Sequence, residues 1–242
     1  MRDVSAEMKP GKTNLIIGTS GSGKTVLMKI IIGLLQVDSG EVFYEGRDLV
    51  KMEEKELKDL RKQIGMLFQG GALFDSKTVE ENVKFPLDMF TRQSNREKLD
   101  RVNEVLARVN LVDTNKKYPA EISGGMRKRV ALARAIVQNP KYLFCDEPNS
   151  GLDPQTSLVI DKLVKEITQE YNITTIINTH DMNTVMESGD HIVYMYQGLK
   201  QWEGSSRDII FSKDEKLNAF IFASEFLAKA KEMTMLEASR KS

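Results

Sequence analysis

The sequence predicts an α/β fold in which a parallel sheet is interrupted by an inserted helical block. Short apolar runs that indicate buried strands alternate with longer stretches of helical periodicity, a pattern typical of parallel sheets. Between about residue 78 and residue 140 the sequence is mostly helical and contains a plainly amphipathic stretch. The expected strands are 13–18, 41–46, 64–69, 142–147, 173–180 and 191–197, and the expected helices include 24–35, 52–63, 95–110 and 153–167.

Length and composition are those of a globular chain with one large domain. We expect 1–77 and 139–212 to form an α/β core, 78–138 a helical subdomain and 213–242 a helical tail. Lys plus Arg equals Asp plus Glu at 35 each, so the bulk charge indicates no nucleic-acid partner. The single cysteine, Cys145, excludes an internal disulfide and favours a reducing compartment. Apolar runs are too short for a membrane span, and the first residues lack the apolar core of a signal peptide.

A glycine-rich loop follows the first expected strand and opens a helix. The stretch GTSGSGKT fits the pattern G-x-x-x-x-G-K-[ST] in full. In this context, glycines let backbone N–H groups turn toward phosphate oxygens, the lysine reaches the terminal phosphates, and the last hydroxyl ligates Mg²⁺. A chance glycine loop is the alternative, which the strand before it and the helix after it disfavour. The predicted nucleotide-binding residues are Gly18, Thr19, Ser20, Gly21, Ser22, Gly23, Lys24 and Thr25.

The expected strand YLFCDEP ends in two acids. Asp146 is a candidate Mg²⁺ ligand, and Glu147 a candidate base that orients the attacking water. A strand followed by a charged turn is a common alternative, and the phosphate loop in the same chain favours the functional interpretation. Gln69 and His180 also end expected strands, where ligands of open α/β sheets gather. Each of them alone, like Asp153 in SGLDP, is equally compatible with an ordinary loop residue or helix cap.

Taken together, these motifs resemble those of ABC transporter nucleotide-binding subunits. Five elements occur in family order: the phosphate loop, Gln69, the signature ISGGM, the acidic strand end with SGLD, and His180. The resemblance implies a P-loop NTPase core with a helical signature subdomain, and an ATPase that uses ATP and Mg²⁺. It assigns catalysis to Glu147, His180 and Lys24, and metal binding to Thr25, Gln69 and Asp146.

The resemblance also implies a second copy of the chain. Ser123, Gly124 and Gly125 would clamp the γ-phosphate of ATP held by the other subunit, at a helix N-terminus that favours an anion. One phosphate loop and one signature per chain imply a head-to-tail homodimer with two ATP molecules between the subunits. The resemblance further implies a separate integral permease, and a peripheral position on the cytoplasmic face of the bacterial inner membrane.

A finer resemblance is to the ATPases of bacterial MCE-type lipid transporters of the Mla group. It depends on Met126 and Lys128 in the signature helix and on the segment MLFQGGALFDSKTVEENVKFPL. It implies phospholipid transport with a YrbE/MlaE-type permease and an MCE-domain protein. An ABC subunit for a different substrate, or a soluble ABC ATPase in a role such as cluster assembly, stays open. A GTPase is disfavoured because the guanine-reading pattern Asn-Lys-x-Asp is missing from the sequence.

Two positions depart from the usual family pattern. No aromatic residue that stacks on adenine precedes Gly18, so we expect weaker ATP binding than in a member that has one, with the phosphate chemistry intact. Asn149 stands where threonine is common, and since asparagine also makes turn hydrogen bonds, we expect little effect.

Overall fold

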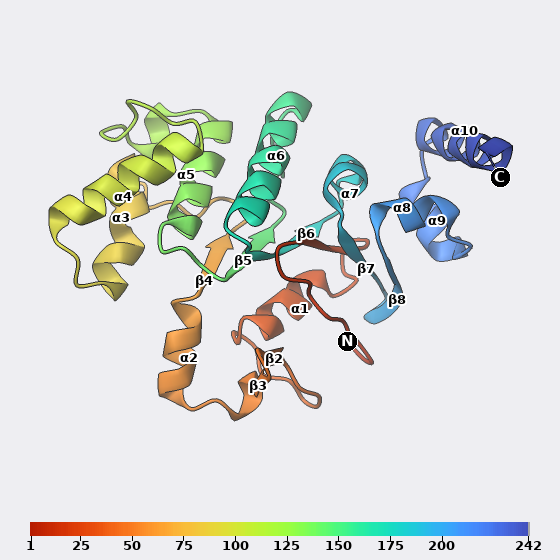
Figure 1. Ribbon diagram of the computed structural model, residues 1–242, viewed down its shortest axis with the longest axis horizontal. Coiled ribbons are helices and arrows are strands. Elements are labelled where there is room, and N and C mark those ends of the chain that lie inside the picture. Colours follow the sequence, from red (N-terminus) through yellow and green to blue (C-terminus); the bar gives the residue numbers. More distant parts are fainter. Residues whose placement is uncertain (242) are drawn as a thin grey trace.

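The computed structural model describes residues 1–241 and is built around a six-stranded sheet (Figure 1). The first five strands in spatial order are parallel, and the last is antiparallel to its neighbour. The strand order is β4 (Ile64–Leu67), β5 (Tyr142–Asp146), β6 (Thr174–Thr179), β1 (Thr13–Ile17), β7 (His191–Tyr196) and β8 (Leu199–Gly204). The predicted α/β class with a parallel sheet is therefore confirmed.

Apolar side chains cover both faces of this sheet. Successive side chains of a strand point to opposite faces, so Leu15 and Ile17 join one apolar cluster while Ile16 joins another. Helix α1 (Lys24–Ile31) packs on the Ile16 side, whereas α5 (Gly124–Ile136), α6 (Pro154–Glu170) and α7 (Met182–Ser188) contribute to the other cluster. Burial on both faces explains why the strands are near-continuous apolar runs rather than alternating ones.

The predicted helical block lies beside β4 and contains α3 (Val79–Phe90), α4 (Asn95–Arg108), the 3₁₀ turn Pro119–Glu121 and α5. Its first two helices begin at capping boxes, in which Thr78 pairs with Glu81 and Ser94 with Glu97. The three-way division of the chain at residues 77, 138 and 212 stays a prediction.

The strand expected at 41–46 is wrong in extent. The structure has a small hairpin there, β2 (Phe43–Tyr44) and β3 (Arg47–Asp48), followed by the 3₁₀ turn Leu49–Lys51 and α2 (Glu54–Arg61). Glu45 and Gly46 both have positive φ, at 49° and 79°, as a tight two-residue hairpin turn requires. The chain therefore reverses inside the segment that the apolar pattern assigned to one strand.

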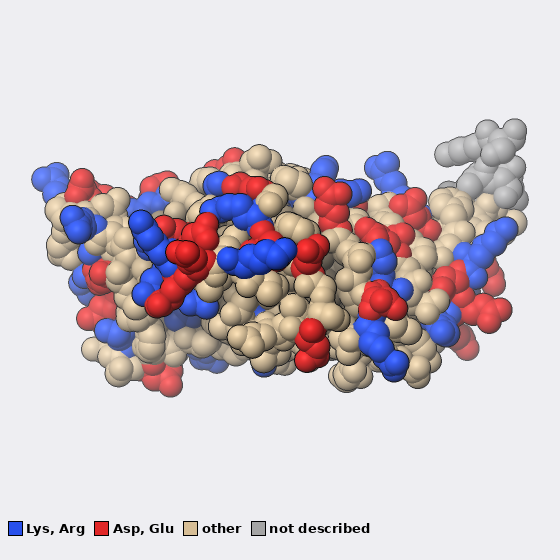
Figure 2. All heavy atoms as spheres, turned by 90° about the horizontal axis from the view of Figure 1, so that it is seen from below, with Lys and Arg blue, Asp and Glu red and all other residues tan. Residues whose placement is uncertain are grey.

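The last part of the chain adds an antiparallel strand and three helices. Strand β8 follows β7 through a turn at Gln197 and Gly198, which also have positive φ. Helices α8 (Ser206–Phe211), α9 (Glu215–Ile221) and α10 (Glu225–Lys241) then extend from the end of the sheet opposite the helical block (Figure 1). Within residues 1–241, no helix combines the length and apolar composition that a membrane crossing requires. Acidic and basic side chains are interspersed over the face that Figure 2 shows.

Candidate functional site

The glycine-rich loop joins β1 to α1 in the geometry of a phosphate cradle. Gly18 is buried with φ 149°, and a Cβ there would lie 2.3 Å from the Met195 carbonyl oxygen, so a side chain is excluded. Gly23 has φ 103° and precedes α1 without a side-chain cap, and the first turn of α1 has no acidic residue. The first N–H groups of α1 are thus left for an external anion.

Lys24 is held directly at this loop. Its side chain is largely buried, and Nζ donates to the carbonyl oxygens of Gly18 (2.9 Å) and Thr19 (3.2 Å). Burial lowers the pKa of Lys24, and the carboxylates of Glu147 and Asp146 oppose that effect. Within the described part of the chain, the buried Ser22 hydroxyl has no hydrogen-bond partner. A desolvated ammonium beside an unpartnered hydroxyl and a free helix N-terminus fits the phosphates of a nucleotide.

Glu147 is the centre of a polar network at the carboxyl ends of adjacent strands. Its Oε1 lies 3.0 Å from Nδ1 of His180, and its Oε2 accepts a 3.3 Å hydrogen bond from Nε2 of Gln69. Gln69 also donates to the Ser150 hydroxyl at 3.3 Å. Since β4, β5 and β6 are neighbours in the sheet, the residues that follow them meet at one edge.

The backbone of Glu147 is in an uncommon conformation. Its φ is 47°, in the left-handed region that residues with a Cβ rarely adopt, while its N–H donates to the Asn178 carbonyl at 2.9 Å. Strained backbone of this kind persists only where the surroundings hold it, and it clusters at functional sites.

Asp146 has a partner that the sequence analysis missed. Asn178 lies opposite Asp146 in the β5–β6 register, and its Nδ2 donates to Asp146 Oδ1 at 3.2 Å and contacts the Met28 sulfur at 3.7 Å. Asn178 is fully buried in β6, whose other residues are threonine and isoleucine. A lone amide in such a buried strand is the signal that would have found it. Thr25 follows Lys24 at the start of α1 with an exposed side chain.

Two basic residues of α5 hold the loop that carries Gln69. Lys128, which is largely buried, donates its ammonium to the Gln69 carbonyl, and burial lowers its pKa. Arg134 donates to the carbonyls of Gly71 at 2.7 Å and Ala72 at 2.8 Å. We name Lys128 and Arg134 the loop clamp. The sequence analysis had assigned neither residue to the site.

The signature turn makes hydrogen bonds and close contacts of its own. Ser123 caps α5 by accepting a 3.2 Å hydrogen bond from the Met126 N–H. A Cβ on Gly125 would lie 2.4 Å from the Thr156 methyl group, so glycine permits the close approach of α6. The hydrogen bonds recorded for residues 1–241 do not connect Ser123, Gly124 or Gly125 to Lys24 or Glu147. Asp153 caps α6, with Oδ1 accepting from the Thr156 N–H at 3.0 Å.

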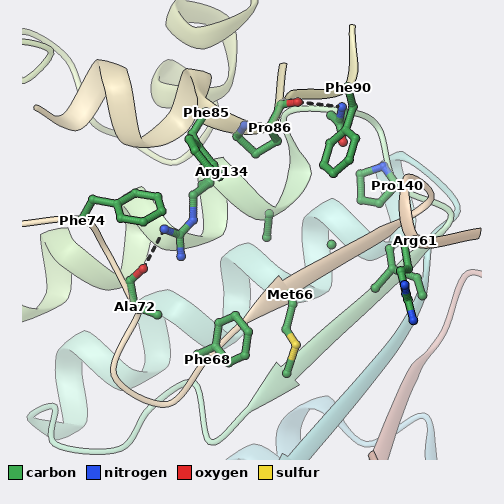
Figure 3. Close-up of a pocket in the computed structure, with 14 residues that line it drawn as sticks. Arg61, Met66, Phe68, Ala72, Phe74, Phe85, Pro86, Phe90, Arg134 and Pro140 are labelled. Carbon is green, nitrogen blue, oxygen red and sulfur yellow. Dashed lines mark hydrogen bonds between the residues drawn. The ribbon is translucent and has the colours of Figure 1, made fainter. Parts of the chain in front are cut away.

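An apolar groove opens beside the Gln69 loop, between that loop, β4 and the helical block (Figure 3). Its volume is about 290 Å³. Arg134 points toward Phe74, with the guanidinium 6.0 Å from the ring centre, and Phe74 meets Phe85 edge to face at 4.8 Å. The lining also includes Arg61, Met66, Phe68, Pro86, Phe90 and Pro140.

Comparison with known proteins agrees with this geometry. Residues 1–150 match the family model described as "ABC transporter". The chain is 45% identical over 212 residues to the methionine import ATP-binding protein MetN of Carboxydothermus hydrogenoformans, covering 87% of this chain and 62% of that protein. It is 38% identical over 213 residues to the probable ribonucleotide transport ATP-binding protein mkl of Mycobacterium tuberculosis, covering 88% and 59%. The chain thus spans about three fifths of these curated relatives.

Solved structures share the same fold. The dimeric structure of MJ0796, a bacterial ABC transporter cassette, superimposes with a TM-score of 0.78 at 33% identity, covering 86% of this chain and 90% of that chain. CbiO1 from Clostridium perfringens, part of the transporter complex cbiONQ, gives a TM-score of 0.81 at 29% identity, covering 96% and 90%. The chain therefore belongs to the ABC transporter family and carries the family's ATPase domain.

Proposed function

We propose that this chain is the ATP-hydrolysing subunit of an ABC transporter. The observation that carries the proposal is the placement of Glu147, whose carboxylate is held between His180 and Gln69 with Lys24 close enough for its pKa to respond to it. A carboxylate so placed accepts a proton from a water that attacks the γ-phosphate. The direct test is phosphate release from ATP by the purified full chain with Mg²⁺, alone and with its permease, and no release in either case would refute the proposal.

Each predicted residue has a role in this scheme. Lys24 and the amides of residues 18–25 bind the phosphates and offset their charge. His180 contacts the γ-phosphate and fixes the rotamer of Glu147. Mg²⁺ bound at Thr25, Gln69 and Asp146 would neutralise part of the phosphate charge. Asn178 orients the Asp146 carboxylate through its 3.2 Å hydrogen bond.

Lys24→Met should weaken ATP binding about ten- to a hundredfold. Hydrogen bonds to a charged group contribute about 1.5–3 kcal/mol, which converts to that change in affinity. Isothermal titration calorimetry with ATP measures it. Lys29→Met, which removes an exposed lysine from the last turn of the same helix, is the matched control. Equal ATP affinity in the two variants would remove Lys24 from the phosphate site.

The active unit in this proposal is a head-to-tail homodimer. Ser123, Gly124 and Gly125 contact the γ-phosphate of ATP on the partner subunit. Within residues 1–241 they make no hydrogen bond to Lys24 or Glu147, which supports this, as does the dimeric arrangement reported for the MJ0796 cassette. The backbone amides of Gly124 and Gly125, which precede the amide that Ser123 caps, provide the anion site.

A separate membrane permease docks in the groove beside Gln69 in this scheme. The groove is apolar and carries exposed aromatic edges, and its floor includes a residue of the loop clamp, Arg134. Because Arg134 donates to the carbonyls of Gly71 and Ala72, a displacement of Arg134 at the groove would move the loop that carries Gln69. In this scheme the chain is a peripheral subunit at the cytoplasmic face of the bacterial inner membrane.

Phe90→Asp should abolish copurification with the permease while leaving ATP binding by the chain unchanged. Phe90 is 46% exposed at the groove, so a carboxylate there removes apolar contact without unfolding the helix. Phe43→Asp is the control, because Phe43 is 58% exposed on β2, outside the groove lining. Permease recovery equal to wild type with Phe90→Asp would exclude the groove as the docking site.

We propose phospholipid as the transported substrate, with a YrbE/MlaE-type permease and an MCE-domain protein as partners. The support is the resemblance to the Mla group of the signature helix, with Met126 and Lys128, and of the segment MLFQGGALFDSKTVEENVKFPL. The similarity to MetN favours methionine as the second candidate. The Glu147→Gln chain, purified from detergent-solubilised membranes with ATP and Mg²⁺, distinguishes them by mass spectrometry. An MCE-domain protein with bound phospholipid supports the first candidate, another permease excludes it, and soluble partners alone would favour a non-transport ATPase.

A further inference from the structure

A buried polar triad joins three separate elements of the fold, close in sequence to Glu147 and His180. Asn149 is in the loop after β5, Asp161 is on α6 and Thr184 is on α7, and their exposed fractions are 8%, 5% and 0%. Asn149 Nδ2 donates to Asp161 Oδ1 at 2.7 Å and to Thr184 Oγ1 at 3.1 Å. Thr184 Oγ1 donates to Asp161 Oδ2 at 2.8 Å, which closes the triad.

The triad connects the two segments that must stay in register for Glu147 and His180 to meet. Asn149 is two residues after Glu147, and Thr184 is four residues after His180. Glu147 is held at a φ of 47° with its side chain 22% exposed, whereas the His180 side chain is 62% exposed, so little packing fixes the imidazole. Their 3.0 Å contact therefore depends on where the two backbones are held.

Burying the carboxylate of Asp161 costs free energy that a residue with only a packing role would not require. Burial raises its pKa, with the negative charges of Asp181 and Glu187 acting in the same direction and the hydrogen bonds from Asn149 and Thr184 acting against it. An apolar residue of similar volume often stabilises a fold more than a buried charge does. A carboxylate instead has two oxygens, which accept directional hydrogen bonds from two different segments at once.

We infer that Asp161 is a positioning residue for ATP hydrolysis, which fixes the Glu147 loop against the start of α7 through Asn149 and Thr184. The inference rests on the proposed function, because it assigns a role in that reaction. The hydrogen bonds to the Asp161 carboxylate within residues 1–241 come from Asn149 and Thr184, and none of them reaches Glu147 or His180. It acts on the orientation of Glu147 and His180 and leaves the phosphate loop unchanged.

Two variants remove the triad with little change of shape. Thr184→Val keeps the volume and loses the hydroxyl, while Asp161→Asn loses the charge and places an amide against a hydroxyl that already accepts from Asn149. Thr184→Ser retains the hydroxyl as the conservative variant. Thr168→Val is the matched control, because Thr168 is a fully buried threonine of α6 whose hydroxyl bonds Val164 and Thr175, away from the site.

Steady-state ATP hydrolysis by the full chain is the first measurement. Thr184→Val and Asp161→Asn should lower kcat about tenfold or more with KM for ATP within about twofold, since small misplacement of a catalytic group has effects of this size. Thr184→Ser should recover most of the rate, and Thr168→Val should keep it. A kcat for Thr184→Val equal to that of Thr168→Val would overturn the inference and leave the triad a purely structural feature.

Imidazole nitrogen resonances give a second measurement that needs no turnover. The chain has two histidines, and His191 is buried between Asn14 and Glu203, so it serves as an internal reference. In Thr184→Val the His180 signals should move while those of His191 stay, and in Thr168→Val neither should move. If the wild-type chain shows no ATP hydrolysis, the proposed function fails, and with it the role of the triad in that reaction. If the His180 signals of Thr184→Val do not move, the triad does not position His180, and the inference is overturned whether or not the chain hydrolyses ATP.

Discussion

Replacement of Glu147 by glutamine is expected to leave ATP binding intact and to lower the rate of hydrolysis at least about a hundredfold. A general base contributes typically 10²–10⁴-fold to a rate, and the amide cannot accept the proton. It keeps the shape of the side chain, and its amide oxygen can still accept from Gln69 while its NH2 faces Nδ1 of His180. Phosphate release and nucleotide titration on the same preparation measure the two effects separately.

The same variant should accumulate the ATP-bound dimer, because hydrolysis is the step that would release it. Sedimentation velocity with ATP and Mg²⁺ measures the dimer fraction. Glu170→Gln is the matched control, since Glu170 is a surface acid paired with Arg108 at 2.7 Å and lies at the far end of α6. A Glu147→Gln chain that hydrolyses ATP at the rate of Glu170→Gln would refute the assignment of the base.

Substitution of Gly65 by alanine is expected to lower the free energy of unfolding by roughly 3 kcal/mol. A Cβ at this position of β4 would lie 2.2 Å from the carbonyl oxygen of Ala135 and 3.1 Å from Cγ of Pro140. The first of these is a backbone atom of α5, which cannot move without shifting the helix against the sheet. Overpacking of a tight core typically costs about 1–3 kcal/mol, and a backbone clash lies at the upper end.

Equilibrium urea unfolding followed by circular dichroism measures this loss. Gly70→Ala is the control, because a Cβ on Gly70 has no heavy atom within 4 Å and its φ is not positive. Equal unfolding free energies for Gly65→Ala and Gly70→Ala would show that α5 tolerates displacement from β4.

The positions of Lys24, Glu147, Gln69 and His180 could be predicted from the sequence because each is tied to the end of an apolar strand. Strand ends are local features, and a parallel sheet brings them to one edge whatever the details of packing. The phosphate loop was recognisable for the same reason, since its glycines and lysine act within eight consecutive residues. Their roles in catalysis stay predictions.

The residues that support these groups could not be predicted, because their partners are distant in the sequence. Asn178 faces Asp146 only through the β5–β6 register, and Lys128 reaches Gln69 across 59 positions. The expectation that asparagine in place of threonine at position 149 has little effect was based only on hydrogen bonds within its own turn. In the structure its side chain bonds Asp161 and Thr184, so its replacement would affect two helices. Hairpin turns were missed for a related reason, since Glu45 carries no sequence signal for positive φ.

Helix α5 connects the signature turn to the loop that carries Gln69. The signature turn is its first turn, and the Gln69 loop is gripped along its side by Lys128 and Arg134. Because a helix curves only gently over thirteen residues, a tilt of α5 would move the signature glycines and the Gln69 backbone together. A displacement of the groove lining that tilts α5 would therefore move the signature turn and the Gln69 loop at the same time.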